Sequence, residues 1–274
     1  MKKIFIVIAF LQFQFTYSQI IVSDYSLSKI IEETSGLEII GDYFITHNDS
    51  EGYPILYYLS KEGIIIKERK VESAVNTDWE DITKDDKCIY ISDTGNNFNN
   101  RKDLKIYKIP INENSAEKTQ IISFNYPEQV SFKNNTSTIF DAEGLISLDD
   151  KLLIFTKNRR KKITEIYSIP KIQGDYSAKK IQTLNVNSIV TGADYNSDLK
   201  LLALTSTMDF TEYYLITISD FNLYSKNDYQ INMIKIPIGK TQVEAIKIID
   251  KNNFWITSED ESGTKYARLL RLKI

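Results

Sequence analysis

Short stretches in which apolar and polar residues alternate recur along most of the chain. The stretch at 104–109, Leu-Lys-Ile-Tyr-Lys-Ile, is one example, and 164–169, 213–216 and 268–272 follow the same pattern. Alternation with a period of two is typical of β-strands that bury one face. The chain also contains 17 Tyr and 13 Phe, which favour the half-buried surface of a sheet. The pattern predicts an all-β protein.

A turn-and-strand unit returns five times, with copies beginning near residues 34, 78, 141, 191 and 242. Each first strand is followed by a second apolar run that ends in a small hydroxyl residue, namely Thr46, Ser92, Thr156, Thr205 and Thr257. Repeats of about fifty residues are typical of propeller blades. We therefore predict a single β-propeller of five four-stranded blades. Six blades would result if the long second unit contains a further one around residues 121–124.

The two ends of the chain are expected to meet. The last unit stops after its third strand, and the apolar residues 20–22 can supply the missing outer strand. Such pairing closes the ring and covers an open sheet edge.

Residues 1–18 have the features of a secretory signal peptide. A basic start precedes an apolar stretch at 4–15 and small residues at 16–18, which predicts cleavage before Gln19. The alternative is a buried strand or an uncleaved anchor, but a membrane span needs about 20 apolar residues. We expect a propeller domain at 19–274 that is secreted or periplasmic, at the cell envelope, with no membrane span after cleavage.

The charge and the cysteine content exclude some classes of partner and one source of stability. The net charge is -3 and no RNA-binding motif or basic helix is recognisable, so we expect no nucleic-acid partner. Cys88 is the only cysteine, which excludes an internal disulfide and leaves the core to stabilise the fold. We expect a monomer that binds a small molecule, a glycan or a protein.

Propeller geometry brings the starts of the first strands and the ends of the second strands to one channel mouth. Aligning the five units puts these residues at one equivalent position: Glu80, Glu143 and Glu244, with Ser35 and Ala193 in the other two blades. Converging carboxylates repel one another unless a cation, a basic neighbour or a raised pKa relieves them. With Asp93 as a further oxygen donor, the three glutamates predict a Ca²⁺ site. The alternative is that each glutamate caps backbone or bonds to the neighbouring blade.

Polar side chains near the ends of the second strands are expected to line the same mouth as ligand-binding residues. They are His47, Asn48, Asp49, Asn96, Asn97, Arg101, Lys157 and Arg159. His47 is the only histidine, so a zinc site built from several histidines is excluded, and we expect His47 to be a polar residue of the rim. The turn at 93–97 is interpreted either as a tight turn or as a loop that faces a ligand. The basic run at 159–162 is either solvated or attracts a phosphate or carboxylate.

Two short motifs carry a resemblance to known families. Asp-Ala-Glu-Gly-Leu at 141–145 and Asp-Thr-Gly-Asn-Asn at 93–97 resemble motifs of the propeller phytases and esterase-like phytases. The resemblance implies calcium-dependent hydrolysis of phosphate esters, with Glu143 and Asp93 as calcium-side carboxylates. The chain more loosely resembles lactonase-type propellers, which hold one divalent metal with a glutamate at a strand start.

A second resemblance covers most of 19–274. Ser-Gly-Leu-Glu at 35–38, His-Asn-Asp-Ser at 47–50 and Asp-Trp-Glu-Asp-Ile at 78–82 are similar to stretches of exported β-propeller proteins of Bacteroidetes-type bacteria, whose function is unknown. Fold alone does not transmit function. We therefore expect a binding or scaffold protein with a carboxylate-rich channel mouth. The alternative is a metal-dependent hydrolase of phosphate esters or lactones, in which Glu80, Glu143 and Glu244 hold the ion.

Overall fold

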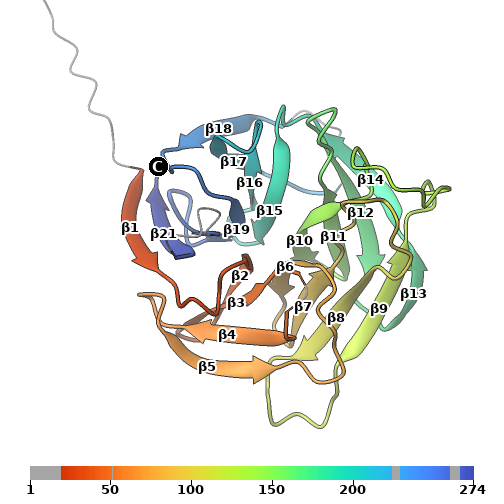
Figure 1. Ribbon diagram of the computed structural model, residues 1–274, viewed down its shortest axis with the longest axis horizontal. Helices are drawn as coiled ribbons and strands as arrows, with labels where there is room; N and C mark the ends of the chain where they lie inside the picture. The colour runs from red at the N-terminus through yellow and green to blue at the C-terminus, as the bar shows by residue number, and fades with distance from the viewer. Residues whose placement is uncertain (1–19, 51, 224–228, 260–265) are drawn as a thin grey trace, which may run out of the picture.

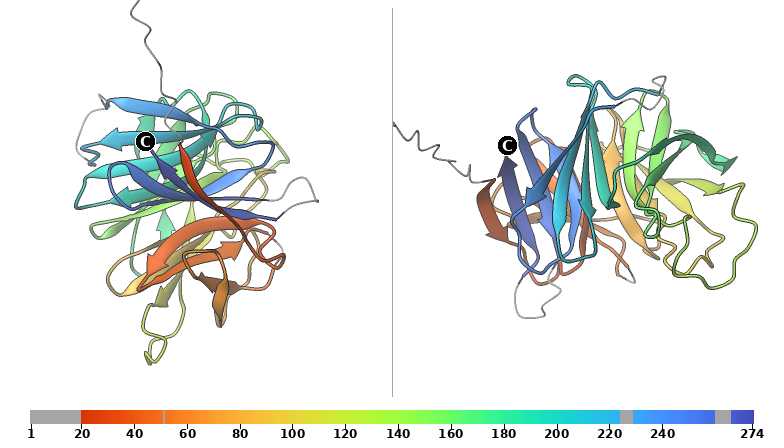
Figure 2. Two further views of the ribbon diagram at one scale, coloured as in Figure 1. Left: turned by 90° about the vertical axis from the view of Figure 1, so that its left-hand side faces the viewer. Right: turned by 90° about the horizontal axis from the view of Figure 1, so that it is seen from above.

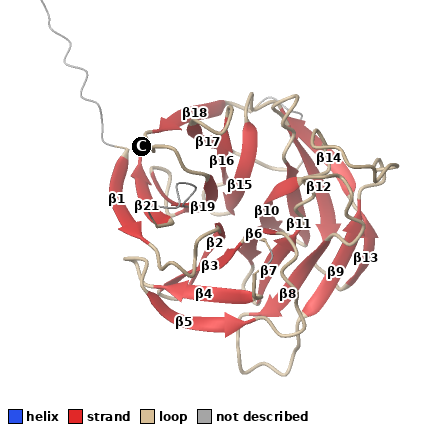
Figure 3. Ribbon diagram, viewed as in Figure 1, coloured by secondary structure: helices blue, strands red, loops and turns tan. Residues whose placement is uncertain are grey.

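The computed structural model describes residues 20–50, 52–223, 229–259 and 266–274, so the expected signal peptide at 1–18 lies outside the described residues. Within these ranges the regular structure consists of β-strands, which form five sheets around a central axis (Figures 1 and 3). No helix in the described part of the chain is long and apolar enough to cross a membrane. The prediction of a five-bladed β-propeller is confirmed.

The first three blades follow one another along the chain. Blade 1 consists of β2 (Thr34–Ile40), β3 (Tyr43–Asn48), β4 (Ile55–Leu59) and β5 (Ile65–Lys70). Blade 2 consists of β6 (Trp79–Lys84), β7 (Cys88–Asp93), β8 (Lys105–Pro110) and β9 (Gln120–Asn125). Blade 3 consists of β10 (Ala142–Leu148), β11 (Lys151–Thr156), β12 (Thr164–Pro170) and β14 (Lys179–Leu184).

The last two blades complete the ring. Blade 4 consists of β15 (Ile189–Asn196), β16 (Leu201–Thr207), β17 (Tyr213–Ser219) and β18 (Ile231–Ile236). Blade 5 consists of β19 (Val243–Ile248), β20 (Asn253–Ser258), β21 (Arg268–Lys273) and the N-terminal strand β1 (Ile21–Ser26). Strand β1 lies antiparallel to β21 (Figure 2), and Arg268 forms an ion pair with Asp24 across them. The predicted closure of the ring by the two chain ends is confirmed.

The sixth blade considered for residues 121–124 is not present. These residues belong to β9, the fourth strand of blade 2. The second unit is long because its strands are joined by the connections at 94–104 and 111–119 and are followed by the connection at 126–141. Strand β13 (Gly174–Ser177), from the connection between β12 and β14 of the third unit, pairs in parallel with β9. A single strand from the neighbouring blade extends blade 2 to five strands.

The core is divided among the contacts between blades. Buried apolar residues of the described chain form five clusters, and each cluster joins two neighbouring blades. The cluster between blades 5 and 1, for example, packs Phe44 against Trp255 with ring centroids 5.0 Å apart. Because both faces of each sheet are covered by neighbours, burial of apolar area stabilises the closed ring as a whole.

Candidate functional site

A β-bulge at the start of the first strand aims the candidate glutamates. In blade 2, Trp79 lies opposite Asp93 and Asp81 lies opposite Ser92, so Glu80 is an extra residue between them. The same shift leaves Glu143 in β10 and Glu244 in β19 as extra residues. A bulge re-aims the side chain of its extra residue. The repeat therefore places the three glutamates at equivalent positions, as the alignment predicted.

The alignment was wrong for the other two blades. The extra residue of β15 is Thr191, because Val190 lies opposite Ser206 and Gly192 opposite Thr205. In β2 the register shift lies between Ser35 and Glu38, so the extra residue is at 36–37 and not at Ser35. Counting residues from the turns cannot locate a bulge, since the extra residue is defined only by the partner strand.

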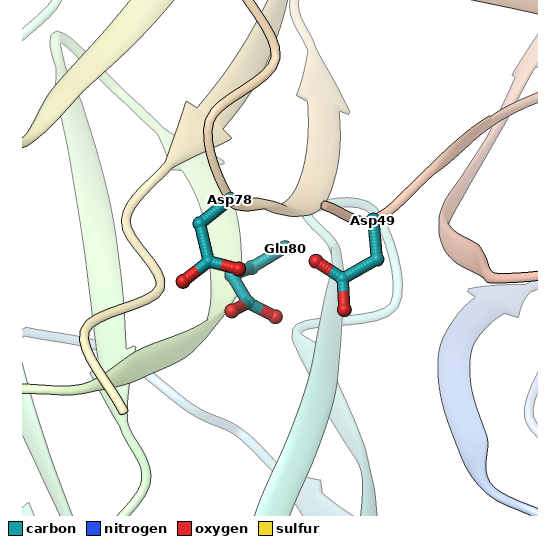
Figure 4. Close-up of side chains that lie close together, drawn as sticks. All are labelled: Asp49, Asp78 and Glu80. Carbon is teal, nitrogen blue, oxygen red and sulfur yellow. The ribbon is translucent and has the colours of Figure 1, made fainter. Parts of the chain in front are cut away.

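Three carboxylates converge where blades 1 and 2 meet the channel. Each of Asp49, Asp78 and Glu80 offers one oxygen, and these oxygens lie within 4.8 Å of one another (Figure 4). Asp78 and Glu80 flank the start of β6, whereas Asp49 follows β3. We call these three residues the carboxylate group. Their spacing is compatible with simultaneous contact to one ion, because Ca²⁺ binds oxygen at about 2.3–2.6 Å.

The carboxylate group has no cation of its own. Among the described residues, no Lys, Arg or His nitrogen lies within 4.0 Å of a carboxylate oxygen of Asp49, Asp78 or Glu80. Glu80 is only 4% exposed, and Asp49 Oδ1 is buried with no hydrogen-bond partner in the described structure. Buried carboxylates without partners are costly, which makes this group the most conspicuous unsatisfied feature of the mouth.

The pKa values of the group follow from its surroundings. Burial, and then the charges of Glu143 and Asp49, hold the pKa of Glu80 well above its usual value. Burial, and then Asp78, do the same to the pKa of Asp49. Burial and the charge of Asp141 raise the pKa of Asp78 to about 7. Without a bound cation, this group therefore retains protons at pH values where ordinary carboxyls are ionised.

A second set of acidic oxygens adjoins the first through Glu80. Oxygens of Glu80, Asp141 and Glu143 also lie within 4.8 Å of one another. Here the protein supplies its own cations: Lys157 Nζ lies 2.8 Å from Glu143 Oε1, and Arg159 Nη1 lies 2.6 Å from Asp141 Oδ2. Asp141 and Glu143 are therefore paired with cations, whereas the carboxylate group has no ion pair in the described structure.

Lys157 is the central cation of the site. It is only 7% exposed. Burial alone would lower the Lys157 pKa, but the charges of the surrounding carboxylates, with Glu143 first, together outweigh burial and raise it. Lys157 therefore remains charged and neutralises part of the acidic mouth.

Glu244 and Asp93 do not join the carboxylate group. Glu244 is 6% exposed, and burial holds its pKa well above the usual value although Lys157 opposes the shift. Asp93 is fully buried and forms an ion pair with Arg101, with Asp93 Oδ1 2.8 Å from Nη2. The predicted set of four is thus divided: Glu80 lies in the carboxylate group, Glu143 is paired, Glu244 stands beside Lys157, and Asp93 is neutralised.

His47 is not the rim residue that we expected from the sequence. It is fully buried at the end of β3, with its ring edge-on to Trp79 and ring centroids 5.4 Å apart. Its Nδ1 lies 3.1 Å from the carbonyl oxygen of Asn48. His47 is the next-to-last residue of this strand and lies at the contact between blades 1 and 2, so it belongs to the core.

The three candidate asparagines hold the loops in place. Asn48 donates to the Ile30 carbonyl oxygen at 2.7 Å, and Asn97 accepts from Arg159. Asn96 donates through its backbone N–H to Asp141 Oδ1 at 2.7 Å. The turn at 93–97 therefore supports the site, because Asn96 and Asn97 connect the loop of blade 2 to Asp141 and Arg159.

Sequence reasoning missed Asp78 and Asp141. Each stands two residues before its bulge glutamate, in Asp-Trp-Glu at 78–80 and Asp-Ala-Glu at 141–143. This Asp-x-Glu repetition was the available signal. Its meaning depends on the bulge, which turns the glutamate towards the aspartate and so brings both carboxylates to the mouth.

Comparisons with known proteins support the fold. No protein-family model matches the chain, and no curated protein matches it either. Among solved structures, the PQQ-bound form of an aldose sugar dehydrogenase from Streptomyces coelicolor is similar at 11% identity with a TM-score of 0.50, covering 92% of this chain and 97% of that one. A Thermus thermophilus protein described as an oxidoreductase of glucose dehydrogenase type is similar at 9% identity with a TM-score of 0.47, covering 91% and 99%. At 11% identity the likeness to the Streptomyces protein concerns the fold alone.

Proposed function

We propose that this protein is a divalent-cation-binding β-propeller that holds Ca²⁺ at one mouth of its channel and uses the ion to bind an anionic ligand. The observation that carries the proposal is the carboxylate group, whose oxygens lie within 4.8 Å of one another and include the buried, unpartnered Asp49 Oδ1, with no ion pair to a cation of the described protein. Carboxylate oxygen is the donor type that Ca²⁺ and Mg²⁺ prefer, and Ca²⁺ tolerates irregular geometry better than Mg²⁺.

The ligand's charge follows from the neighbours of the group. Lys157 and Arg159 lie on the adjoining side of the mouth, next to Glu143 and Asp141, and Glu80 belongs to both sets of acidic oxygens. A phosphate or carboxylate placed over Glu80 would meet the ion on one side and these cations on the other. This arrangement favours a small anionic molecule or an anionic group of a glycan or protein.

Calcium-dependent hydrolysis is the second candidate function. A bound ion would polarise a phosphate ester or lactone, or lower the pKa of a water molecule, and Lys157 and Arg159 would orient the anion. The phytase-like motifs at 93–97 and 141–145 belong to this proposal. We also propose that the protein acts outside the cytoplasm, at the cell envelope, after removal of residues 1–18.

The test begins with protein freed of metal by a chelator. Calorimetric titration with CaCl₂ should give saturable binding, and a free ion concentration of 100 times the Kd should stabilise the fold by about 2.7 kcal/mol. Glu80→Gln and Asp78→Asn should abolish both effects. Glu68→Gln, a change at an exposed glutamate of β5, serves as the control.

Ligand and substrate are tested with the calcium-loaded protein. Inorganic phosphate and PQQ, the latter chosen because the Streptomyces protein carries it, should bind more tightly with Ca²⁺ than without. Release of nitrophenol from p-nitrophenyl phosphate, lost in Glu80→Gln, would favour the hydrolase. Absence of Ca²⁺ and Mg²⁺ binding by the wild-type protein would refute both functions.

A further inference from the structure

A pocket lies at the face of the ring opposite the carboxylate group, between blades 1 and 5. Strand β2 runs from the carboxylate mouth at Thr34 to Ile40, and β19 runs in the same sense to Ile248. The pocket is lined where these strands end, by Ile39, Gly41, Asp42, Tyr43, Phe44, Lys61, Ile249, Trp255 and Arg271. Its volume is about 390 Å³, within the range of small-molecule sites.

Two cross-strand pairs build this pocket. Ile39 lies directly opposite Phe44 in blade 1, and Trp255 lies directly opposite Arg271 in blade 5. Residues opposite one another on neighbouring strands point to the same face of the sheet. The pocket therefore has an apolar wall from one blade and a wall of one tryptophan and one arginine from the other.

The aromatic part of the pocket is rigid. Trp255 is held between Phe44, at 5.0 Å between ring centroids, and Tyr25, stacked at 6.3 Å with an interplanar angle of 21°. Trp255 is 9% exposed, whereas Tyr43 and Ile249 are each 41% exposed at the pocket edge. A flat apolar body in the pocket would contact the exposed parts of Trp255, Tyr43 and Ile249.

Arg271 supplies a cation that has no carboxylate partner in the described chain. Its Nη2 donates to Asn253 Oδ1 at 3.0 Å, and no carboxylate oxygen of a described residue lies within 4.0 Å of its guanidinium, whereas Arg268 on the same strand pairs with Asp24. Asn253 in turn donates to Asp250. Arg271 is thus oriented by an amide and keeps further N–H donors for a ligand.

The charges of the lining favour an anion. Lys61 and Arg271 contribute two cations and Asp42 one carboxylate, so the lining itself is positive. Asp250, outside the lining, interacts with Arg271 through its charge and lies in contact with Asn253. Sugars need several hydrogen-bonding groups, but the remaining lining is mainly aliphatic and aromatic. A single anionic group joined to an apolar body fits this lining best.

We propose that the pocket between blades 1 and 5 binds an aromatic carboxylate, with its ring against Trp255 and Phe44 and its carboxylate on Arg271. This site is independent of the cation site at the other mouth. Binding here therefore requires neither Ca²⁺ nor the carboxylate group.

The test compares three probes with the full chain by titration calorimetry: 3-phenylpropionate, the uncharged 3-phenylpropanol, and propionate. The acid should bind saturably. The alcohol, which lacks the carboxylate, and propionate, which lacks the ring, should each bind at least about tenfold more weakly than the acid. Equal affinity for acid and alcohol, or no saturable binding of the acid, would overturn the proposal.

Two substitutions on β21 locate the binding. Arg271→Gln should lower the affinity for 3-phenylpropionate about tenfold and leave the affinity for 3-phenylpropanol unchanged. The matched Arg268→Gln should leave both affinities unchanged. Asp42→Asn, at an exposed turn, removes a negative charge that repels the carboxylate of 3-phenylpropionate. This change should tighten binding of the acid about twofold. An Arg271→Gln protein that binds the acid normally, or an Asp42→Asn protein with weaker acid binding, would contradict the site. Glu80→Gln should bind the acid like wild type even if calcium binding fails.

Discussion

Gly95 forms a backbone hydrogen bond to Asp78, and the Asp78 carboxylate occupies the position that a Gly95 side chain would fill. The Gly95 amide donates to the Asp78 carbonyl oxygen at 3.2 Å, and a Cβ on Gly95 would lie 2.2 Å from Asp78 Oδ2 and from Glu80 Oε1. Glycine is therefore required here for close approach. The loop after β7 packs against the carboxylates of Asp78 and Glu80 and limits their positions.

Gly95→Ala should displace the carboxylate group without removing any ligand. The added methyl forces the Asp78 and Glu80 side chains to move, so we expect calcium affinity to fall about tenfold or more, since ligand placement sets affinity. Calorimetric titration of metal-freed protein measures the change. Gly239→Ala is the matched control, because nothing lies within 4 Å of a Cβ at that position. Unchanged affinity in Gly95→Ala would place the ion elsewhere.

Glu80→Gln should stabilise the ion-free protein at pH 8, by about 1–3 kcal/mol, because it removes a buried carboxyl whose pKa is held well above its usual value and which therefore costs free energy at this pH. The pH dependence should change with it. Asp78, for example, has a folded-state pKa of about 7 against an ordinary value of 3.8, so the folded state binds more protons between these values. This contribution to stability is present at low pH and is lost as pH rises through 7.

Urea unfolding at pH 5.5 and pH 8, with a chelator present, tests both statements. Between these two pH values wild type should lose more stability than Glu80→Gln. A Glu80→Gln protein that is less stable than wild type at pH 8 would show that Glu80 already has a partner.

Lys157 should be essential to the fold. Lys157→Met leaves Glu143 buried and unpaired, and breaking a buried pair in this way costs about 3–5 kcal/mol. Glu143→Gln combined with Lys157→Met should recover most of that loss, since no unpaired charge remains on this pair. A double-mutant cycle by chemical denaturation measures the coupling, and additive effects would show that the 2.8 Å contact contributes little.

His47 should titrate far below an ordinary histidine. Burial lowers its pKa from 6.5 to about 4, although hydrogen bonds to backbone oppose the shift. Because the unfolded state takes up the proton first, stability from neutral His47 is present above pH 6.5 and is lost as pH falls through 4, by about 3 kcal/mol in full. As the chain contains one histidine, its NMR signal needs no assignment. A titration midpoint near 6.5 would mean that the ring reaches solvent.

Strand β1 should be required for cooperative folding. A protein that begins at residue 27 lacks the strand paired with β21 and exposes an open edge in blade 5. We expect a lower and broader thermal transition, together with a tendency to associate, measured by circular dichroism and by sedimentation. Asp24→Asn serves as a milder control, because it removes only the exposed ion pair with Arg268. A sharp transition at the wild-type temperature would show that blade 5 is stable with three strands.

The sequence by itself determined the architecture. Alternating apolar positions recur in five units, and the apolar residues 20–22 predicted the strand that the last unit lacks, which the structure shows as β1. Strand periodicity and repetition are local properties of the chain, so they can be read without knowing which blade touches which. The shared position of Glu80, Glu143 and Glu244 was predicted for the same reason.

Only the tertiary structure decided what each of these side chains does. Glu143 meets Lys157 and Asp93 meets Arg101, whereas Glu80 meets Asp49 and Asp78. Whether a carboxylate is neutralised or left without a cation depends on atoms from several blades, and a bulge of one residue changes where a side chain points. The burial of His47 and the pocket beside Arg271 depend likewise on how blade 1 packs against its two neighbours, which no single stretch of sequence encodes.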